Sequence, residues 1–410
     1  MLPEGWKETQ PANIVAFFNG FAFKSTDTTD QGIKWLKISN VTPGGISWKE
    51  CNYLPVGFCK KYRDFLVKKG DVVVALTRPI INNHLKIGRL ESEDDLSLLN
   101  QRVAKIVPKN GNYLDYIYHL FRSDDFSNKI QQALLGTDPP NLSMSVLKRF
   151  LLPLPPLSEQ KKIAAILSTW DCAIEGMEKL LANSQQQKKA LMQQLLTGKK
   201  RLPGFTEEWK TRTLGEIGEI SSAGVDKKSV DGEEPVRLLN FTDVFKRTFI
   251  YSDDLHQWVT APSRKVQKCN VKKGDVFFTP SSETRNDIAF SAVAAENMQS
   301  CCYSYHVVRL RFKEKWDDAF KAFIFSTMSF RKQVYKLADG SGQRYVISQD
   351  DFRSIEISYP SLDEQRQIGA LLHTAENEMT AIESDLLRLR QEKKALMQQL
   401  LTGKCRVKVN

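Results

Sequence analysis

The sequence predicts an α+β fold in which two similar mixed α/β globular parts are joined by two long antiparallel coiled-coil helices, with a pseudo-two-fold internal repeat. The first observation is a repeated segment: Lys188 to Lys199 recurs letter for letter as Lys393 to Lys404, 205 positions later. The second is a heptad pattern of apolar residues leading into each copy. The third is the length of 410 residues, twice that offset.

The repeat extends over the whole chain. Pro155 to Gln160 matches Pro360 to Gln365, and Val67 to Val72 matches Val271 to Val276. Near the start of each copy, Gly20-x3-Lys24-Ser25 is matched by Gly224-x3-Lys228-Ser229. We therefore expect four parts: a first globular domain (1–157), a central helical spacer (158–200), a second globular domain (201–361) and a C-terminal helical spacer (362–410).

Both helical parts carry apolar residues at spacings of three and four, the seam of a coiled coil. Ser158 and Asp363 are predicted N-caps, and Gly198 and Gly403 are predicted to follow the last helical turns. The predicted helix-pair packing residues are Ile163, Leu167, Trp170, Ile174, Met177, Leu181, Leu191 and Leu195 in the first copy, and Ile368, Leu372, Met379, Ile382, Leu386, Leu389, Leu396 and Leu400 in the second.

Each seam needs a partner, and the chain supplies one. A pair within the chain is favoured over dimerisation between chains, and the long globular segment between the helices favours an antiparallel pair. Lys188 and Lys393 occupy equivalent seam positions, where they are expected to weaken packing but help to fix the register. Alternatively, both lysines extend to solvent.

The globular parts combine strands and helices. Strands are predicted at 35–41, 71–76 and 101–107, and in the second copy at 236–241, 275–278 and 305–312. Helical regions are predicted from Tyr113 to Leu135 and from Asp317 to Leu337. Loops follow them at 136–141 and 339–345.

Composition narrows the class of protein. The net charge of +11 and pI near 9.1 suit a nucleic acid or another anionic partner. No apolar run is long enough for a membrane span, and no signal peptide is visible. The seven cysteines and five histidines show no metal-site or disulfide spacing. A reduced, cytoplasmic protein without a metal site is expected.

No catalytic residues are predicted. Gly198-Lys199 and Gly403-Lys404 lack the rest of a phosphate-binding loop. Asp138-Pro-Pro-Asn141 lacks the aromatic residue of an amino-methyltransferase tetrad, and no glycine-rich turn for S-adenosylmethionine is present. Asp385 and Glu392 lie on the repeated helix, where a charged face is expected.

Taken together, these motifs resemble the specificity subunit of type I restriction-modification enzymes. The Pro-x-Leu-Ser/Asp-Glu-Gln entry to each helix and the Lys188 to Lys199 exit are typical of that family, as are Gly20 to Ser25, Lys69-Gly-Asp71 and Asn100 to Arg102. The resemblance covers essentially the whole chain. At Tyr305 and His306 the second copy departs from Gln101 and Arg102, so the resemblance assigns these positions no shared base-reading role.

The resemblance implies a non-catalytic DNA reader. Each globular part would be a target-recognition domain for one half of a bipartite, asymmetric target in double-stranded DNA. The helices, about 57 Å long at 1.5 Å per residue, would set the spacer and dock methyltransferase subunits. Two methyltransferase and two restriction/motor subunits are the implied partners. S-adenosylmethionine, ATP and Mg²⁺ would bind those partners, leaving no cofactor on this chain.

The predicted DNA contacts are basic and amide side chains that follow strands, because Arg and Asn can make bidentate contacts to G and A. Lys24 and Lys228 suit sequence-independent phosphate contact. The other predicted DNA-binding residues are Thr77, Arg78, Asn82, Asn83, His84, Lys86 and Asn141 in the first copy, and Ser281, Ser282, Thr284, Arg285, Asn286, Gln343, Arg344 and Tyr345 in the second. The alternatives are a coiled-coil scaffold without a DNA role, or a nuclease or methyltransferase in its own right.

Overall fold

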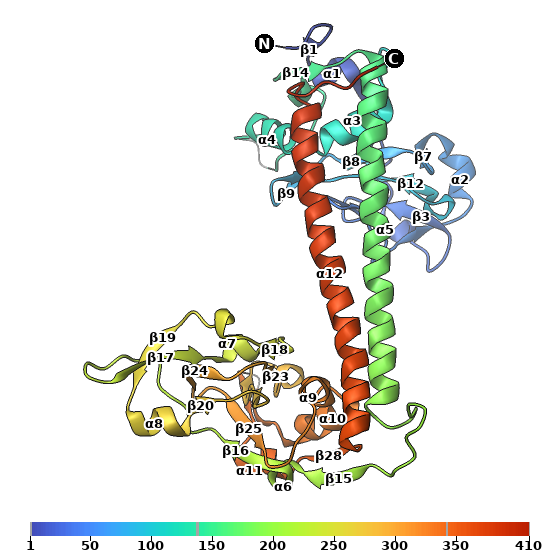
Figure 1. The fold of residues 1–410 in the computed structure, drawn as a ribbon. Helices are drawn as coiled ribbons and strands as arrows, with labels where there is room; N and C mark the ends of the chain where they lie inside the picture. Colours follow the sequence, from blue (N-terminus) through green and yellow to red (C-terminus); the bar gives the residue numbers. More distant parts are fainter. Residues whose placement is uncertain (1, 137–138, 342, 410) are drawn as a thin grey trace. The chain divides into compact units, whose positions relative to one another are not determined.

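The computed structural model describes residues 2–136, 139–341 and 343–409 (Figure 1). The chain forms two compact units. Unit 1 comprises Met1–Met177 and Asp385–Asn410, and unit 2 comprises Glu178–Ser384. The two long helices are α5 (Leu157–Leu195) and α12 (Leu362–Leu400). Each helix is divided between the units, so that one part of it belongs to unit 1 and the other part to unit 2. The predicted fold class, two mixed α/β parts with two long helices in a repeat, is confirmed.

Both units contain the same pair of sheets. In unit 1 the order β11-β8-β13-β2 faces a second sheet, β6-β3-β12-β7; in unit 2 the matching sheets are β16-β25-β21-β23-β18 and β19-β17-β24-β20. A short antiparallel pair, β1 with β14 or β15 with β28, joins the start of each globular part to its end. The topology therefore repeats, as the sequence does.

The strands and short helices of the two units have the following bounds. Unit 1 contains β1 (Lys7–Thr9), α1 (Pro11–Ile14), β2 (Val15–Asn19), β3 (Ile33–Leu36), β4 (Val41–Thr42), β5 (Gly45–Ile46), β6 (Tyr53–Leu54), α2 (Phe58–Lys61), β7 (Leu66–Val67), β8 (Val72–Ala75), β9 (Ile80–Ile81), β10 (His84–Leu85), β11 (Ile87–Arg89), β12 (Ser97–Leu99), β13 (Val103–Pro108), α3 (Leu114–Phe121), α4 (Asp124–Ala133) and β14 (Leu152–Leu154). Unit 2 contains β15 (Lys210–Thr213), α6 (Leu214–Ile217), β16 (Gly218–Ser221), β17 (Glu234–Leu239), α7 (Phe241–Val244), β18 (Phe249–Ile250), β19 (Trp258–Ala261), α8 (Ser263–Lys268), β20 (Asn270–Val271), β21 (Val276–Phe278), β22 (Ser281–Ser282), β23 (Ser291–Ala294), β24 (Met298–Tyr303), β25 (Val308–Phe312), α9 (Asp318–Ile324), α10 (Met328–Leu337), β26 (Asp339–Ser341), β27 (Arg344–Val346), α11 (Gln349–Ser354) and β28 (Glu356–Tyr359).

The central strand β8 is apolar on both faces because it lies between two buried layers. Val72 and Val74 belong to the core shared with α3 and α4, whereas Val73 and Ala75 belong to the core against the second sheet. In unit 2, β21 divides its side chains in the same way. Alternating sides of a strand are thus both buried, which explains the continuous apolar run in the sequence.

Each predicted helical region contains two helices, α3 and α4 in unit 1 and α9 and α10 in unit 2. In unit 1 the break falls at Ser123, whose hydroxyl accepts a hydrogen bond from the Phe126 N–H at 3.2 Å and so caps α4. Thr327 caps α10 in the same way through Phe330. A capping side chain supplies an acceptor that the first turn lacks, so a new helix begins there. In the loop after α4, Thr137 and Asp138 lie outside the described residues.

The predicted N-caps of the long helices are wrong by a small margin. α5 and α12 begin at Leu157 and Leu362, so Ser158 and Asp363 lie inside the first turn. At the other end, Gly198 and Gly403 have φ of +66° and +76°, the left-handed conformation that terminates a helix.

The Glu-Gln pair at the start of each long helix fastens it to its globular part. Glu364, which is fully buried, receives two hydrogen bonds of 2.7 Å from the Arg201 guanidinium. Gln365 accepts from the backbone N–H of Asp317 at 3.2 Å, at the N-cap of α9. In unit 1 the matching residues are Glu159 with Arg406, and Gln160 with Tyr113. This repeated motif is therefore explained by structure.

The seam side chains of both helices, and both seam lysines, are buried or half-buried. In unit 1 Lys393 of α12 forms an ion pair with Asp171 of α5, and in unit 2 Lys188 of α5 forms one with Glu376 of α12. Moving 17 residues forward along α5, from Asp171 to Lys188, corresponds to moving 17 residues backward along α12, from Lys393 to Glu376. The two ion pairs therefore share one antiparallel register.

Candidate nucleic-acid interface

In unit 1, the structure brings together two chain segments that carry predicted DNA contacts. Thr77, two residues after the end of β8, forms an isolated bridge with Asn141, and its hydroxyl donates to the Asn141 Oδ1 at 3.4 Å. The backbone N–H of Arg78 donates to the Pro140 carbonyl at 2.8 Å. The Arg78 and Asn141 side chains remain exposed. The loop after the strand and the loop after α4 thus form one surface.

A tight hairpin extends this surface. β9 pairs with β10, and the two residues between them, Asn82 and Asn83, have φ of +48° and +62°. Two consecutive left-handed residues are typical of a type I′ turn, which asparagine tolerates better than most side chains. Asn82, Asn83 and His84 are exposed at the tip.

Lys86 does not fit the predicted contact set. Its residue is only 7% exposed, and its ammonium donates to the Ile38 carbonyl at 3.4 Å. Burial lowers its pKa. Since the side chain points into the domain, we drop Lys86 from the candidate DNA contacts.

In unit 2 the predicted loop at 339–345, of which Gly342 lies outside the described residues, contains β26 and the start of β27. These strands pair with each other, and β27 also pairs with β22. The pairing places Ser282 opposite Tyr345, and Arg344 donates to the Ser281 hydroxyl at 3.0 Å. Gly340 permits the hairpin, because a Cβ there would lie 2.1 Å from a backbone oxygen. Both groups of predicted contacts again share one surface.

Three more predicted contacts of unit 2, Thr284, Arg285 and Asn286, lie in the loop that follows β22. Thr284 donates to the Asp287 carboxylate at 2.8 Å and begins a short 3-10 turn containing Arg285 and Asn286. Thr284, Asn286 and Gln343 are exposed, whereas Arg285 is half-buried.

A turn that the sequence prediction left out lies on the same surface in both units. In unit 1 the Gln101 N–H donates to the Phe21 carbonyl at 3.1 Å, and the Arg102 carbonyl accepts from the Leu76 N–H at 2.9 Å. Gln101 and Arg102 therefore lie between the Gly20 to Ser25 loop and the strand end that carries Thr77. Both side chains are exposed.

The matching turn of unit 2 carries Tyr305, 49% exposed, and His306. His306 lines a hollow of about 560 Å³ together with the predicted contacts Ser281, Ser282, Gln343 and Arg344. The rest of the lining is Lys227, Phe241, Thr242, Phe245, Glu283 and Asp287. In the sequence, this turn is marked by the family-typical motif from Asn100 to Arg102 and by the change of residue type at the matched Tyr305 and His306.

The repeated glycines hold these turns against the Lys-Ser loops. A Cβ at Gly20 would lie 2.2 Å from the Leu99 carbonyl oxygen, and one at Gly224 would lie 2.1 Å from the backbone of Ser304 and Tyr305. Only glycine allows so close an approach. Lys24 and Lys228 follow these glycines and are exposed, as a phosphate contact requires.

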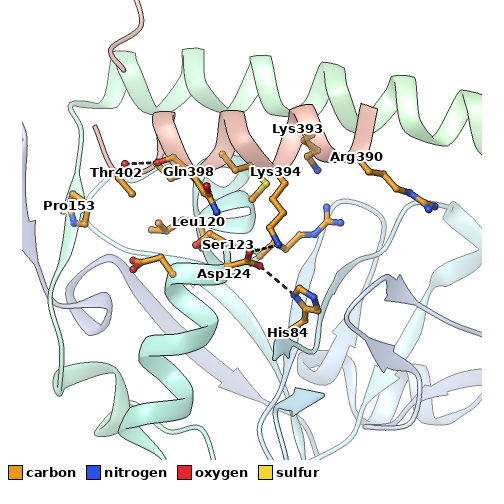
Figure 2. Close-up of a pocket in the computed structure, with 14 residues that line it drawn as sticks. His84, Leu120, Ser123, Asp124, Pro153, Arg390, Lys393, Lys394, Gln398 and Thr402 are labelled. Carbon is orange, nitrogen blue, oxygen red and sulfur yellow. Dashed lines mark hydrogen bonds and ion pairs between the residues drawn. The ribbon is translucent and has the colours of Figure 1, made fainter. Parts of the chain in front are cut away.

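A chain of polar contacts connects the unit 1 hairpin to α12 (Figure 2). The His84 ring nitrogen lies 3.6 Å from one oxygen of Asp124 on α4, and the Lys394 ammonium lies 2.8 Å from the other. These residues border a hollow of about 180 Å³ beside the second copy of the repeated segment. The matching hollow of unit 2, lined by Lys188, Lys189 and Met328, borders the first copy.

Among residues 2–136, 139–341 and 343–409, no group of three or more His, Cys, Asp or Glu side chains is placed to hold a metal ion. Within the same residues, no helix is long and apolar enough to cross a membrane.

Comparison with known proteins identifies the family. The model of the type I restriction modification DNA specificity domain matches twice, at residues 3–183 and 206–389. The chain belongs to this family. The type I specificity family was the one that the sequence motifs predicted, and the two matches correspond to the two copies of the repeat.

Several relatives and solved structures are similar to the chain. The specificity subunit of the MjaVIII enzyme of Methanocaldococcus jannaschii is 36% identical over 49% of this chain and 48% of its own length, so the match spans about half of each protein. The putative MjaX specificity subunit of the same organism is 24% identical over 99% of this chain and 95% of its own length. The S subunit from M. genitalium has a TM-score of 0.59 at 16% identity and covers 97% of this chain and 96% of its own, which shows a shared fold.

Proposed function

We propose that this type I specificity family member is a DNA-sequence reader without catalytic residues of its own. Each globular part would read one half of a bipartite, asymmetric target in double-stranded DNA. The observation that carries the proposal is the pair of matched surfaces: the same strand ends, turns and glycine contacts present different side chains in the two units. Arg78, Asn82 and Gln101 stand in one, and Gln343, Arg344 and Tyr305 in the other.

These side chains suit base reading. Arginine and the amides of Asn and Gln can make paired hydrogen bonds to guanine or adenine in the major groove. The exposed Lys24 and Lys228 suit phosphate contacts that are the same for every sequence. A shared framework with different side chains at the tips supports two readers of different sequence.

The helices would set the spacing between the half-sites. Each has 39 residues, which gives about 58 Å at 1.5 Å per residue. That length lies between one and two turns of B-DNA, at about 34–36 Å per turn. An unread spacer between the half-sites is the expected consequence.

The repeated segment would dock two methyltransferase subunits. Packing explains the identity of its buried leucines, but Lys189 and Gln193 are exposed and yet match Lys394 and Gln398. Identical exposed side chains at two matched places suit two copies of one partner. Two restriction/motor subunits would complete the complex, and S-adenosylmethionine, ATP and Mg²⁺ would bind these partners.

The docking proposal is tested by a charge reversal. Lys189→Glu should remove one of two methyltransferase subunits from the purified complex, measured by mass photometry. Lys162→Glu, also exposed on α5 but outside the repeated segment, is the control and should leave the stoichiometry unchanged. Retention of both subunits at wild-type affinity in Lys189→Glu would contradict docking at this segment.

The reading proposal is tested by an exchange of one globular part. Residues 1–157 are replaced by the matching part of another family member, and methylated positions are mapped by single-molecule sequencing of DNA treated with the complex. One half of the bipartite motif should change while the other half and the methylated strand positions stay. An unchanged motif would reject the proposal, whereas methylation or cleavage by the isolated chain would favour an enzyme.

A further inference from the structure

Arg285 differs from the other arginines on the unit 2 surface in how its guanidinium is held. The guanidinium carbon lies over the ring of Tyr335 at 5.5 Å from the centroid and over the ring of Tyr345 at 5.1 Å. Within the described residues, these two tyrosines are the only aromatic side chains that contact the guanidinium, and no hydrogen bond or ion pair to it is present. Its five N–H donors are therefore oriented by two aromatic rings and remain available to an acceptor.

The two tyrosines come from different elements that are themselves fixed. Tyr345 lies on β27, paired on one side with β22 and on the other with β26. Tyr335 lies on α10, one turn after Arg331. The Arg331 guanidinium donates to the backbone carbonyls of Asn286 and Ile288 at 2.6 Å and of Ala289 at 3.3 Å. One face of α10 thus holds both the backbone and the side chain of the Arg285 turn.

Both ends of this turn are also anchored. The Thr284 hydroxyl donates to Asp287, and the Ala289 N–H donates to the Thr279 carbonyl at 2.8 Å. Ala289 has a φ of +54°, a backbone conformation that residues other than glycine rarely adopt. The fixed backbone and stacked side chain remove much of the conformational entropy that a free arginine loses on binding.

We infer that Arg285 reads a guanine in the half-site of unit 2 by a bidentate contact to its O6 and N7. Arginine paired with guanine is the commonest specific contact in the major groove, since the planar guanidinium matches two acceptors on one base edge. A phosphate contact needs no such orientation, and a lysine would serve it as well. The inference rests on the proposed DNA-reading function, because it names one base within that target.

Unit 1 has no matching arginine stacked between two tyrosines, so its half-site serves as a control within the same molecule. The positions that match Arg285, Tyr335 and Tyr345 are occupied by Ile81, Gln131 and Pro140. A change at Arg285 should therefore alter one position of one half-site and leave the half-site of unit 1 unchanged.

The test measures binding of the full chain, in complex with its methyltransferase subunits, to duplexes that carry each base pair in turn across the unit 2 half-site. In the wild type, one G·C pair should be preferred about 5- to 150-fold over the alternatives, the range of a good bidentate contact. Arg285→Lys should reduce that preference to within about 3-fold, because the ammonium keeps the charge but not the paired donors. Tyr335→Phe keeps the ring and should preserve the preference, whereas Tyr335→Ala should weaken it.

Arg264→Lys, at an exposed arginine on α8, is the matched control and should leave every position unchanged. A wild-type unit 2 half-site without a preferred G·C pair would overturn the inference. So would an Arg285→Lys variant that binds all sequences more weakly by the same factor, which indicates a phosphate contact. A wild type without sequence preference in either half would instead reject the proposed reading function, and the inference with it.

Discussion

Replacing His119 by phenylalanine should remove a large part of the pH dependence of unit 1 stability. His119 lies on α3, is 1% exposed, and faces Ser168 at 3.0 Å through its Nε2. Burial lowers its pKa to about 3, and the attraction of Asp171 is offset by Lys393 and Arg122. The ring is therefore neutral in the folded protein at neutral pH, chiefly because burial disfavours its charged form.

The size of the effect follows from linkage. In the unfolded chain the histidine pKa is near 6.5, so the unfolded state binds the proton more readily than the folded state. The contribution of the neutral His119 ring to the stability of unit 1 is complete above pH 6.5 and is lost as the pH falls toward 3. Between pH 8 and pH 5 the loss is about 2 kcal/mol, and between pH 8 and pH 3 it is about 4 kcal/mol.

The phenylalanine variant is suggested by the protein itself, since Phe323 occupies the matching position of α9. The free energy of opening is measured by hydrogen exchange of peptides from α3, which reports on unit 1 alone. Wild type should lose about 2 kcal/mol more than His119→Phe between pH 8 and pH 5. His256→Phe, at an exposed site in unit 2, should behave like wild type. Equal pH dependence of wild type and His119→Phe would refute the reasoning.

Two further predictions concern stability. Gly20→Ala should cost about 3 kcal/mol in unit 1, since the new Cβ would lie 2.2 Å from a backbone oxygen; Gly57→Ala, with no atom within 4 Å of the new Cβ, should be neutral or slightly stabilising. Differential scanning fluorimetry of both variants checks this, and equal melting temperatures would contradict it. Glu364→Gln should cost about 3 kcal/mol in unit 2, because it breaks the paired hydrogen bonds from Arg201 to a buried carboxylate. The control is Asp363→Asn at the neighbouring exposed position, which should change stability by less than about 0.5 kcal/mol. A comparable loss in the two variants would show that the buried pair of Glu364 with Arg201 does not stabilise unit 2.

Much of the fold could be predicted because it is encoded locally. The apolar run from Val72 to Ala75 predicts a buried strand, and the heptad spacing predicts the long helices. The exact repeat predicts that the two halves of the chain share one architecture. The boundaries of the helices could not be predicted, because single side chains decide them. The break at Ser123 and the helix starts at Leu157 and Leu362 depend on which group accepts the first backbone hydrogens, and several polar neighbours compete for that role.

The candidate interface was harder to predict because it is assembled from distant segments. Lys86 follows a strand like its neighbours, yet the hairpin geometry turns it toward the Ile38 carbonyl and away from solvent. Gln101 and Arg102 lie beside the loop from Gly20 to Ser25 because Gly20 has no Cβ to keep the two backbones apart. The stacking of Arg285 depends on Tyr335 and Tyr345, which are 50 and 60 residues away. None of these relations has a period that a sequence can display.

Lysine at the two seam positions explains how identical helix segments accept different globular parts. Lys393 meets a carboxylate of α5 beside the buried His119. Lys188, its repeat, meets Glu376 and also lies over the Phe323 ring at 5.3 Å. A leucine would serve the aromatic neighbour but not the polar one, whereas lysine offers an apolar stem, a cation for the carboxylate and an ammonium for the ring face. The same twelve letters can therefore pack against both domains while the domains themselves diverge.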